Sequence, residues 1–237
     1  MFAIIKNSPM KNILFLLTFI TLASCKTTKN EKDVTDYFEK SFKEQKDLKL
    51  STEHTEHFDS INNLYSNYKY KVAFDAPNNW STDTGVSEHT IFRTFQPDSA
   101  ITFVINVVEL KVPKNEKAPD IWEMYQNQKD KMDYSIKVLI PEQFNTTVND
   151  FEASKTYLKN RTTLKRKFSY LVRELDTEYS NTSIVYQTLI NNLSYTFSLD
   201  VPTMFYEEKP EYFESLFLKI YFLLNNNNNN DINNKND

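Results

Sequence analysis

The chain has 237 residues, with 28 Lys and Arg against 32 Asp and Glu, which gives a formal net charge of −4. A mildly acidic protein lacks the basic face that nucleic-acid phosphates require, so this composition excludes nucleic-acid binding as the main function. Gly85 is the only glycine, which excludes the glycine-rich loops that cradle nucleotide phosphates. Turns must therefore use Asn, Asp and Pro.

The first functional pattern is the stretch Met10–Cys25. Lys11 precedes a mostly apolar run of ten residues, Ile13–Leu22. A helix needs about 20 apolar residues to span a bilayer, so this run is too short. A basic start, a short apolar core and small residues before a cut site are typical of a secretory signal. The cut site here is Leu22-Ala23-Ser24-Cys25.

These last four residues resemble the lipobox of bacterial lipoproteins at every position. The resemblance implies that the Cys25 thiol receives a diacylglyceryl group and that residues 1–24 are then removed as a signal peptide. One acyl chain binds a membrane only marginally, whereas two or three fatty acids such as palmitate anchor a protein stably. The alternative is an ordinary signal peptide with a chance cysteine. Lys26, where Asp would favour the inner membrane, favours the outer membrane.

Cleavage would remove Lys6 and Lys11 and no acid, so the mature chain carries a net charge of −6. With Cys25 lipidated, no thiol remains for a disulfide. Residues 25–66 are predicted to be the lipidated cysteine and a polar tether, with short helices possible near 34–42 and 58–65. Residues 225–237 contain nine Asn and are predicted to be a disordered tail. A single domain is expected over 67–224.

The first half of that domain predicts strands and one helix. A strand is expected over 68–75, followed by a turn at 76–80, because polar and apolar residues alternate. Ranges 90–96 and 100–110 predict a hairpin. Asp120 is a suitable helix N-cap, with Glu123 completing a capping box, and this helix should end near residue 133.

The second half predicts a strand over 151–160 and a hairpin of 183–190 with 193–199. Residues Thr163–Glu174 fit a helix or a strand, because their apolar residues match both spacings. Pro210 suits the start of a last helix. Its apolar stripe would consist of Phe213, Leu216, Phe217, Ile220 and Leu224.

The order of these elements, with the motif Phe74-Asp75-Ala76-Pro77-Asn78-Asn79-Trp80 after the first strand, resembles the PsbP-like family. Asn79 stands where the family favours Gly, and Asn tolerates the left-handed backbone geometry. The resemblance implies an α+β fold in which an antiparallel sheet lies between helices, an α/β/α sandwich. It also implies accessory or binding roles and no catalytic residues.

Chemical motifs are few. His54 and His57, with Glu53, would share a helical face, but a zincin needs two His four residues apart and further ligands. No serine lies in a Gly-x-Ser-x-Gly elbow. The acids Glu207, Glu208, Glu211 and Glu214 surround a helix start, where the helix dipole favours them. We therefore expect no catalytic residue, no metal site and no cofactor.

The remaining candidates concern recognition. The basic run Lys165-Arg166-Lys167, with Arg161, would form a solvated face or meet anionic lipid headgroups. Aromatic side chains dominate interface hot spots, so some of the following could form a recognition surface: Tyr65, Tyr68, Tyr70, Trp80 and Trp122.

Together these patterns predict a non-enzymatic lipoprotein of the bacterial cell envelope that binds another envelope component. The expected partner is a protein. Two alternatives remain: an envelope hydrolase whose site is assembled from scattered residues, and a carrier of a small apolar ligand held between sheet and helix. A polar pocket with convergent acids would favour the hydrolase, and a large apolar cavity would favour the carrier.

Overall fold

The computed structural model describes residues 56–84, 86–97, 99–110, 120–174 and 177–223. The predicted signal peptide, Cys25, His54 and the Asn-rich tail lie outside these residues. The described chain forms two compact units, one of residues 78–218 and one of residues 56–77 with 219–223. The expected domain 67–224 thus includes parts of both. Within the described residues, no helix is long and apolar enough to cross a membrane.

The smaller unit is a four-stranded antiparallel sheet in the order β1-β2-β3-β11. Its strands are β1 (Glu56–Asp59), β2 (Leu64–Asn67), β3 (Val72–Asp75) and β11 (Ile220–Phe222). The short helix expected over 58–65 is wrong, and the predicted tether is structured from residue 56. Asp59 closes a β1–β2 turn by accepting the backbone N–H groups of Ile61 and Asn62. This local hydrogen bonding competes with helix formation.

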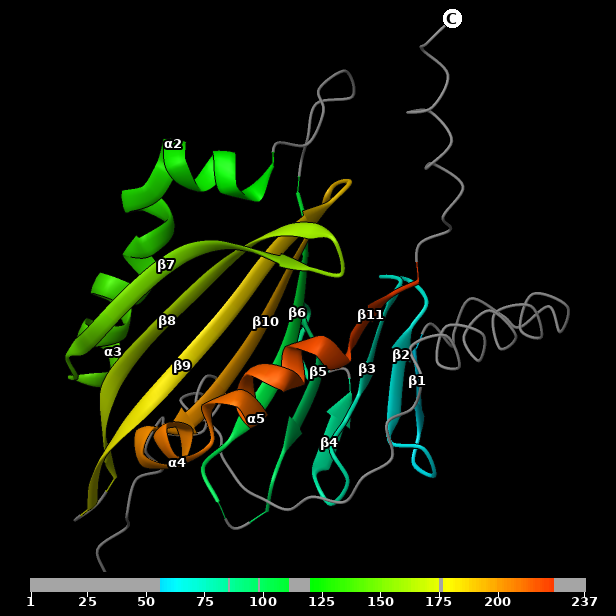
Figure 1. The fold of residues 1–237 in the computed structure, drawn as a ribbon, viewed down its shortest axis with the longest axis horizontal. Helices are drawn as coiled ribbons and strands as arrows, with labels where there is room; N and C mark the ends of the chain where they lie inside the picture. Colours follow the sequence, from blue (N-terminus) through cyan, green and yellow to red (C-terminus); the bar gives the residue numbers. More distant parts are fainter. Residues whose placement is uncertain (1–55, 85, 98, 111–119, 175–176, 224–237) are drawn as a thin grey trace, which may run out of the picture. The chain divides into compact units, whose positions relative to one another are not determined.

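The larger unit is a seven-stranded antiparallel sheet in the order β4-β5-β6-β10-β9-β8-β7 (Figure 1). The two predicted hairpins are confirmed as β5 with β6 and as β9 with β10. The strand bounds are β4 Ser81–Thr84, β5 Thr90–Phe95, β6 Thr102–Glu109, β7 Val148–Leu158, β8 Arg161–Glu174, β9 Thr177–Ile190 and β10 Leu193–Pro202.

The ambiguous segment 163–174 is a strand, because β8 pairs with β7 on one side and β9 on the other. Apolar residues that alternate along a long strand also recur at four-residue intervals, which is why this segment resembled a helix. Strand β4 was not predicted. Its sequence, Ser-Thr-Asp-Thr, has no apolar alternation to reveal it.

The predicted first helix is confirmed as α2 (Ile121–Tyr134), and Asp120 caps it by accepting the N–H groups of Trp122 and Glu123. A π-helical turn, η2 (Ser135–Leu139), and α3 (Ile140–Phe144) continue it. Near the C-terminus lie α4 (Thr203–Glu208), α5 (Pro210–Ser215) and the 3₁₀ turn η3 (Leu216–Lys219).

The last helix is shorter than expected. Ile220 pairs with Phe74 and starts β11, so it does not extend the helical stripe to residue 224. Ile-Tyr-Phe suits a strand because β-branched and aromatic residues fit a pleated surface. The helical spacing of apolar side chains, three and four residues apart, ends with Phe217, about two turns before Leu224, the last residue of the predicted stripe.

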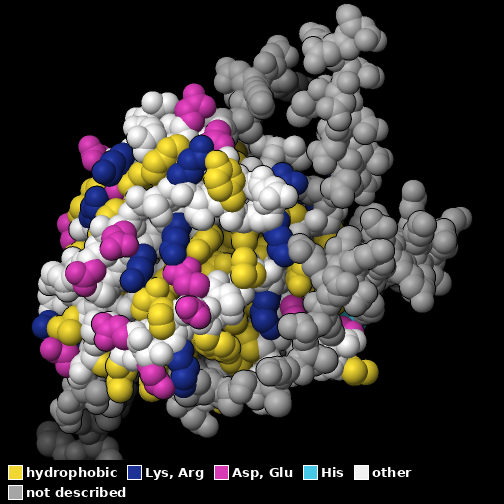
Figure 2. Space-filling model, in the orientation of Figure 1, with side chains coloured by type: hydrophobic (Ala, Val, Ile, Leu, Met, Phe, Trp, Pro, Cys, Tyr) yellow, Lys and Arg dark blue, Asp and Glu magenta, His cyan; other side chains and the backbone are white. Residues whose placement is uncertain are grey.

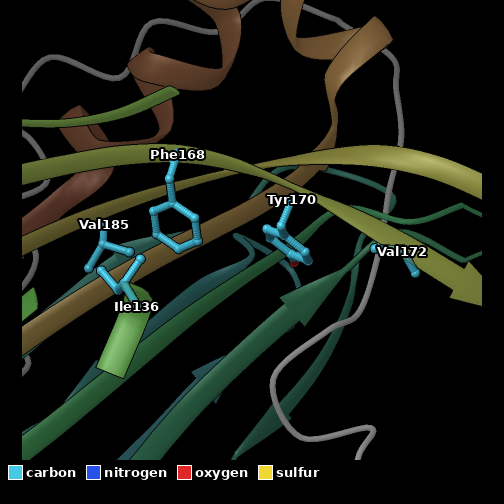
Figure 3. Packing of buried hydrophobic residues seen from close by; sticks show 5 residues of the cluster. All are labelled: Ile136, Phe168, Tyr170, Val172 and Val185. Atoms are coloured by element: carbon cyan, nitrogen blue, oxygen red, sulfur yellow. The ribbon is translucent and has the colours of Figure 1, made fainter. Parts of the chain in front are cut away.

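Helices pack on both faces of the seven-stranded sheet, and alternation along each strand decides which side chains they meet. We name the two faces after their helices. On the α5 face, the Phe217 ring lies 5.4 Å from that of Phe103 and 4.1 Å from that of Tyr186. On the α2 face, Ile136 packs with Phe168 and Val185 (Figure 3). The helices cover these faces only in part. The fold is therefore a sheet-dominated, antiparallel α+β arrangement rather than a complete three-layer sandwich.

Candidate functional site

The basic run does not form one basic surface. Because neighbours on a strand point to opposite faces, Arg166 lies on the α2 face while Lys165 and Lys167 lie on the α5 face. The Lys167 ammonium sits 4.7 Å from the centre of the Tyr206 ring. Figure 2 shows charges of both signs interspersed around a central group of hydrophobic side chains on the side where α4 and α5 lie. The expectation of a lipid-headgroup site at this run finds no support in that distribution.

Glu214 of α5 is the centre of a polar cluster on the α5 face. Its carboxylate accepts hydrogen bonds from Lys165 Nζ at 2.6 Å, Tyr186 Oη at 2.9 Å and Tyr206 Oη at 3.2 Å. Burial, reinforced by the charge of Glu214, raises the pKa of Tyr206 to about 12 and that of Tyr186 further. Both phenols therefore stay protonated and donate. The cluster joins α4 and α5 to β8 and β9, a structural task that explains these residues without catalysis.

Arg166 performs a similar task on the α2 face. Its Nη1 donates to the Met132 carbonyl at 3.0 Å. The buried Asp133 carboxylate accepts from Tyr125 Oη at 3.1 Å and from Lys137 Nζ at 2.9 Å. Burial lowers the pKa of Arg166, while the charge of Asp133 opposes that shift. The Arg166 bond ties the end of α2 to β8, and the Asp133 bonds link α2 to η2.

A third polar cluster, which we call the Asp200 cluster, is harder to explain by structure alone. Its five members come from β6, β8, β9 and β10, and each is at least nine-tenths buried. The exposed fractions are 8% for Asp200, 4% for Tyr170, 1% for Asn181, 4% for Ser183 and 2% for Thr102.

Strand register brings these side chains together. Asp200 stands directly opposite Ser183 on β9 and Thr102 on β6, so all three lie on the α2 face. Tyr170 stands opposite Asn181 on the same face. Figure 3 shows Phe168 and Tyr170 projecting from β8 to the same side. The cluster thus borders the apolar group beneath η2.

The hydrogen bonds of the cluster form a chain of donors that ends at the Asp200 carboxylate. Asn181 Nδ2 donates to Tyr170 Oη at 2.7 Å, and that hydroxyl donates to Asp200 Oδ1 at 3.3 Å. Ser183 also donates to the Asp200 carboxylate. Two buried oxygens, Asn181 Oδ1 and Thr102 Oγ1, have no hydrogen-bond partner. Such atoms are uncommon in native interiors and require an explanation.

The electrostatics of Asp200 follow from this environment. Burial raises the pKa of Asp200 from its ordinary 3.8 to about 7, although the bonds from Ser183 and Tyr170 oppose the shift. No Lys, Arg or His of the described residues forms an ion pair with this carboxylate. Sequence reasoning missed the site. The available signal was an acid between Leu199 and Val201 in a strand that is otherwise suited to burial.

The residues of the predicted aromatic recognition surface are divided between the two compact units. Tyr65, Tyr68 and Tyr70 belong to the smaller unit, and Trp80 and Trp122 to the larger. Tyr65 is fully buried and donates to Glu56 Oε2 at 3.0 Å, and Trp80 is only 7% exposed. Tyr68, Tyr70 and Trp122 are half-buried. Tyr65 and Trp80 are therefore core side chains of their units, and the recognition surface stays a prediction.

The histidines do not converge on a site within the described residues. His57 lies exposed on β1 and His89 is exposed before β5. Across the described part of the chain, no group of three His, Cys, Asp or Glu residues has metal-binding geometry.

Comparison with known proteins gives weak structural likenesses. No protein-family model matches the chain, and no curated protein matches it. Cyanobacterial PsbP (CyanoP) from Synechocystis sp. PCC 6803 is similar with a TM-score of 0.44 and 13% identity, over 67% of this chain and 91% of that one.

Two further structures are similar at the same level. A protein from Bacteroides thetaiotaomicron VPI-5482 has a TM-score of 0.41 and 14% identity, over 64% of this chain and 45% of its own. The Ran-binding protein Mog1p from Saccharomyces cerevisiae has a TM-score of 0.38 and 10% identity, over 66% and 92%. At such scores the likenesses support no argument about function.

Proposed function

We propose that this chain is a lipid-anchored lipoprotein of the bacterial cell envelope, attached by acylated Cys25 to the outer membrane. In this proposal it is not an enzyme, and its PsbP-like domain, an α/β/α arrangement, binds another envelope protein. The anchor is supported by the sequence alone, through the short apolar run and the four residues Leu22-Ala23-Ser24-Cys25.

The binding role is supported by one surface, which we call the open strip. It is the part of the α2 face on β4, β5, β6 and β10, away from β8 and β9, on which α2 packs. Figure 1 shows α2 and α3 beside β7 and β8. The strip consists of Thr196, Ser198, Val104, Asn106, Val108, Thr90, Arg93 and Asp83.

The open strip carries hydrogen-bonding groups with little net charge. Thr90 Oγ1 donates to Asn106 Oδ1 at 2.7 Å, and Arg93 is neutralised by an ion pair with Asp83. Val108 is 37% exposed, and Thr196 is half-buried. Protein interfaces are depleted of charge at their core and retain polar groups at the rim. A neutral, partly apolar sheet surface is therefore suited to a protein partner.

The anchor is tested by Cys25→Ala. We expect the variant to lose labelling with a radioactive or clickable palmitate analogue and to move from the membrane to the soluble fraction. Lys26→Ala, which keeps the lipid attachment residue, should stay on the membrane. If Cys25→Ala resists extraction by salt and carbonate, the anchor lies elsewhere in the chain.

The binding surface is tested by capture from envelope extracts in mild detergent, with Thr196→Lys as the variant and Gln126→Lys, on the exposed side of α2, as the matched control. We expect one partner to be retained by the wild type and the control and to be lost with Thr196→Lys, at equal melting temperatures. A partner that binds all three proteins equally would place the interface outside the open strip. Capture of no partner by the wild type would contradict the binding role.

A further inference from the structure

The Asp200 cluster presents a charge problem that the proposed function does not solve. A buried carboxylate is normally paired with a cation or bound to a metal ion, because desolvation penalises an isolated charge heavily. Asp200 is 8% exposed and has no cationic partner among the described residues. Its neighbours supply only neutral donors, from Tyr170 and Ser183.

The neighbouring atoms have the character of ligands for a cation. Asn181 uses its Nδ2 to bind Tyr170 Oη, which fixes the amide and leaves its carbonyl oxygen, Oδ1, without a donor. Thr102 Oγ1, directly across from Asp200, also lacks a partner. Two buried oxygens, on β6 and β9, therefore lack a donor, and the Asp200 carboxylate on β10 between them lacks a cation. All three side chains are at least nine-tenths buried.

We propose that Asp200, Thr102 and Asn181 bind a small monovalent metal cation through their side-chain oxygens. Hard cations prefer carboxylate, carbonyl and hydroxyl oxygens. One carboxylate with two neutral oxygens balances a single positive charge and leaves no excess. Tyr170 and Ser183 position the carboxylate by donating to it, so they act on the site through Asp200. This site lies beyond the proposed partner binding and does not depend on it.

A proton is the competitor for the same carboxylate. A protonated Asp200 would also remove the buried charge, but it would leave Asn181 Oδ1 and Thr102 Oγ1 unsatisfied unless water reached them. The two explanations differ in salt specificity. Proton uptake is indifferent to the identity of the salt cation at fixed ionic strength, whereas a metal site distinguishes Na⁺ and K⁺ from a bulky cation.

The experiment is thermal unfolding of the purified mature chain at pH 8 in sodium, potassium or tetramethylammonium chloride at equal concentration. A ligand at ten times its Kd raises the melting temperature of a domain this size by roughly 3–6 °C. We expect such a rise with Na⁺ or K⁺ relative to tetramethylammonium. Asp200→Asn should abolish it, and Thr102→Val should reduce it if the Asn variant fails to fold. Ser194→Ala, on the same face but outside the cluster, should retain it.

Three outcomes would overturn the proposal. Equal melting temperatures in all three salts would show that no monovalent metal cation binds at Asp200. A rise that survives in both Asp200→Asn and Thr102→Val would place the cation elsewhere. A rise produced only by added calcium or magnesium would contradict the monovalent assignment.

Discussion

The two faces of the seven-stranded sheet are made by the same strands yet differ in chemistry. On β10, Tyr195, Phe197, Leu199 and Val201 point to the α5 face, while Ser194, Thr196, Ser198 and Asp200 point to the α2 face. All four residues on the α5 face are at most 1% exposed. One strand thus supplies an apolar core on one side and a row of hydroxyls and a carboxyl on the other.

In our proposal the two faces have different roles: the α5 face contributes to folding and the α2 face to binding. Burial of apolar area at about 25 cal/mol per Å² stabilises the α5 face, and the Glu214 carboxylate there accepts three hydrogen bonds. On the α2 face, buried polar atoms such as Asn181 Oδ1 and Thr102 Oγ1 are unsatisfied, and each such group costs about 1–3 kcal/mol. An unsatisfied buried group lowers the stability of the fold and makes no contact that compensates for it. We therefore expect a ligand or partner to bind on the α2 face.

The largest effect is expected on the α5 face, from Phe217→Ala. Phe217 is 1% exposed and its ring contacts those of Phe103 and Tyr186. Removal of a buried Phe side chain costs about 3–5 kcal/mol, so the urea midpoint should fall sharply. Leu218→Ala is the matched control, because Leu218 is 63% exposed and should change the midpoint little. Similar small losses from both variants would mean that η3 does not pack on this face.

The second effect concerns the α2 face and has a sign that depends on pH. Asp200 has a pKa of about 7 in the folded state, raised by burial from 3.8, so the folded protein binds this proton more tightly than the unfolded chain. In tetramethylammonium buffer, its stability should fall as pH rises from about 4 to 7 and level off above. The difference corresponds to roughly 4 kcal/mol at 1.36 kcal/mol per pH unit.

Asp200→Asn removes this proton and keeps the size of the side chain. Denaturation at pH 4.5 and pH 8 should therefore show the variant gaining on the wild type with increasing pH. A constant difference at the two pH values would mean that the Asp200 carboxyl is solvated in the folded state, and the contrast between the two faces would weaken.

The faces differ also in how far the sequence predicts them. Alternation predicted the β9–β10 hairpin, and the spacing of Phe213, Leu216 and Phe217 predicted a helical apolar stripe against it. These signals are local and repeat along the chain. The Asp200 cluster has no such signal, because Thr102, Tyr170 and Asp200 are up to 98 positions apart in the numbering and meet only through strand register.

The failures have related physical causes. Ile220 continues the helical spacing of Phe213 and Phe217, but pairing with Phe74 makes it a strand residue. Tyr65 and Trp80 were assigned to a recognition surface because aromatic residues suit interfaces and cores equally. Only their tertiary neighbours decide between the two. The prediction of acylated Cys25 is not tested by the fold, since its basis is a linear motif.

The smallest effect is expected at the Lys165–Glu214 pair on the α5 face. The ammonium and carboxylate are 2.6 Å apart, but their side chains retain 25% and 27% exposure, so water and salt screen the attraction. Exposed pairs contribute about 0–1 kcal/mol, and Tyr186 and Tyr206 still donate to Glu214 when Lys165 is removed. Lys165→Met should therefore lower the unfolding free energy by less than about 1 kcal/mol, and 1 M KCl should reduce that loss further. Lys159→Met, a lysine substitution on the β7–β8 turn, controls for the change in net charge. A loss above about 2 kcal/mol that persists in high salt would show that the α5 face depends on its ionic cluster as well as on its apolar side chains, and the division of roles between the two faces would not hold.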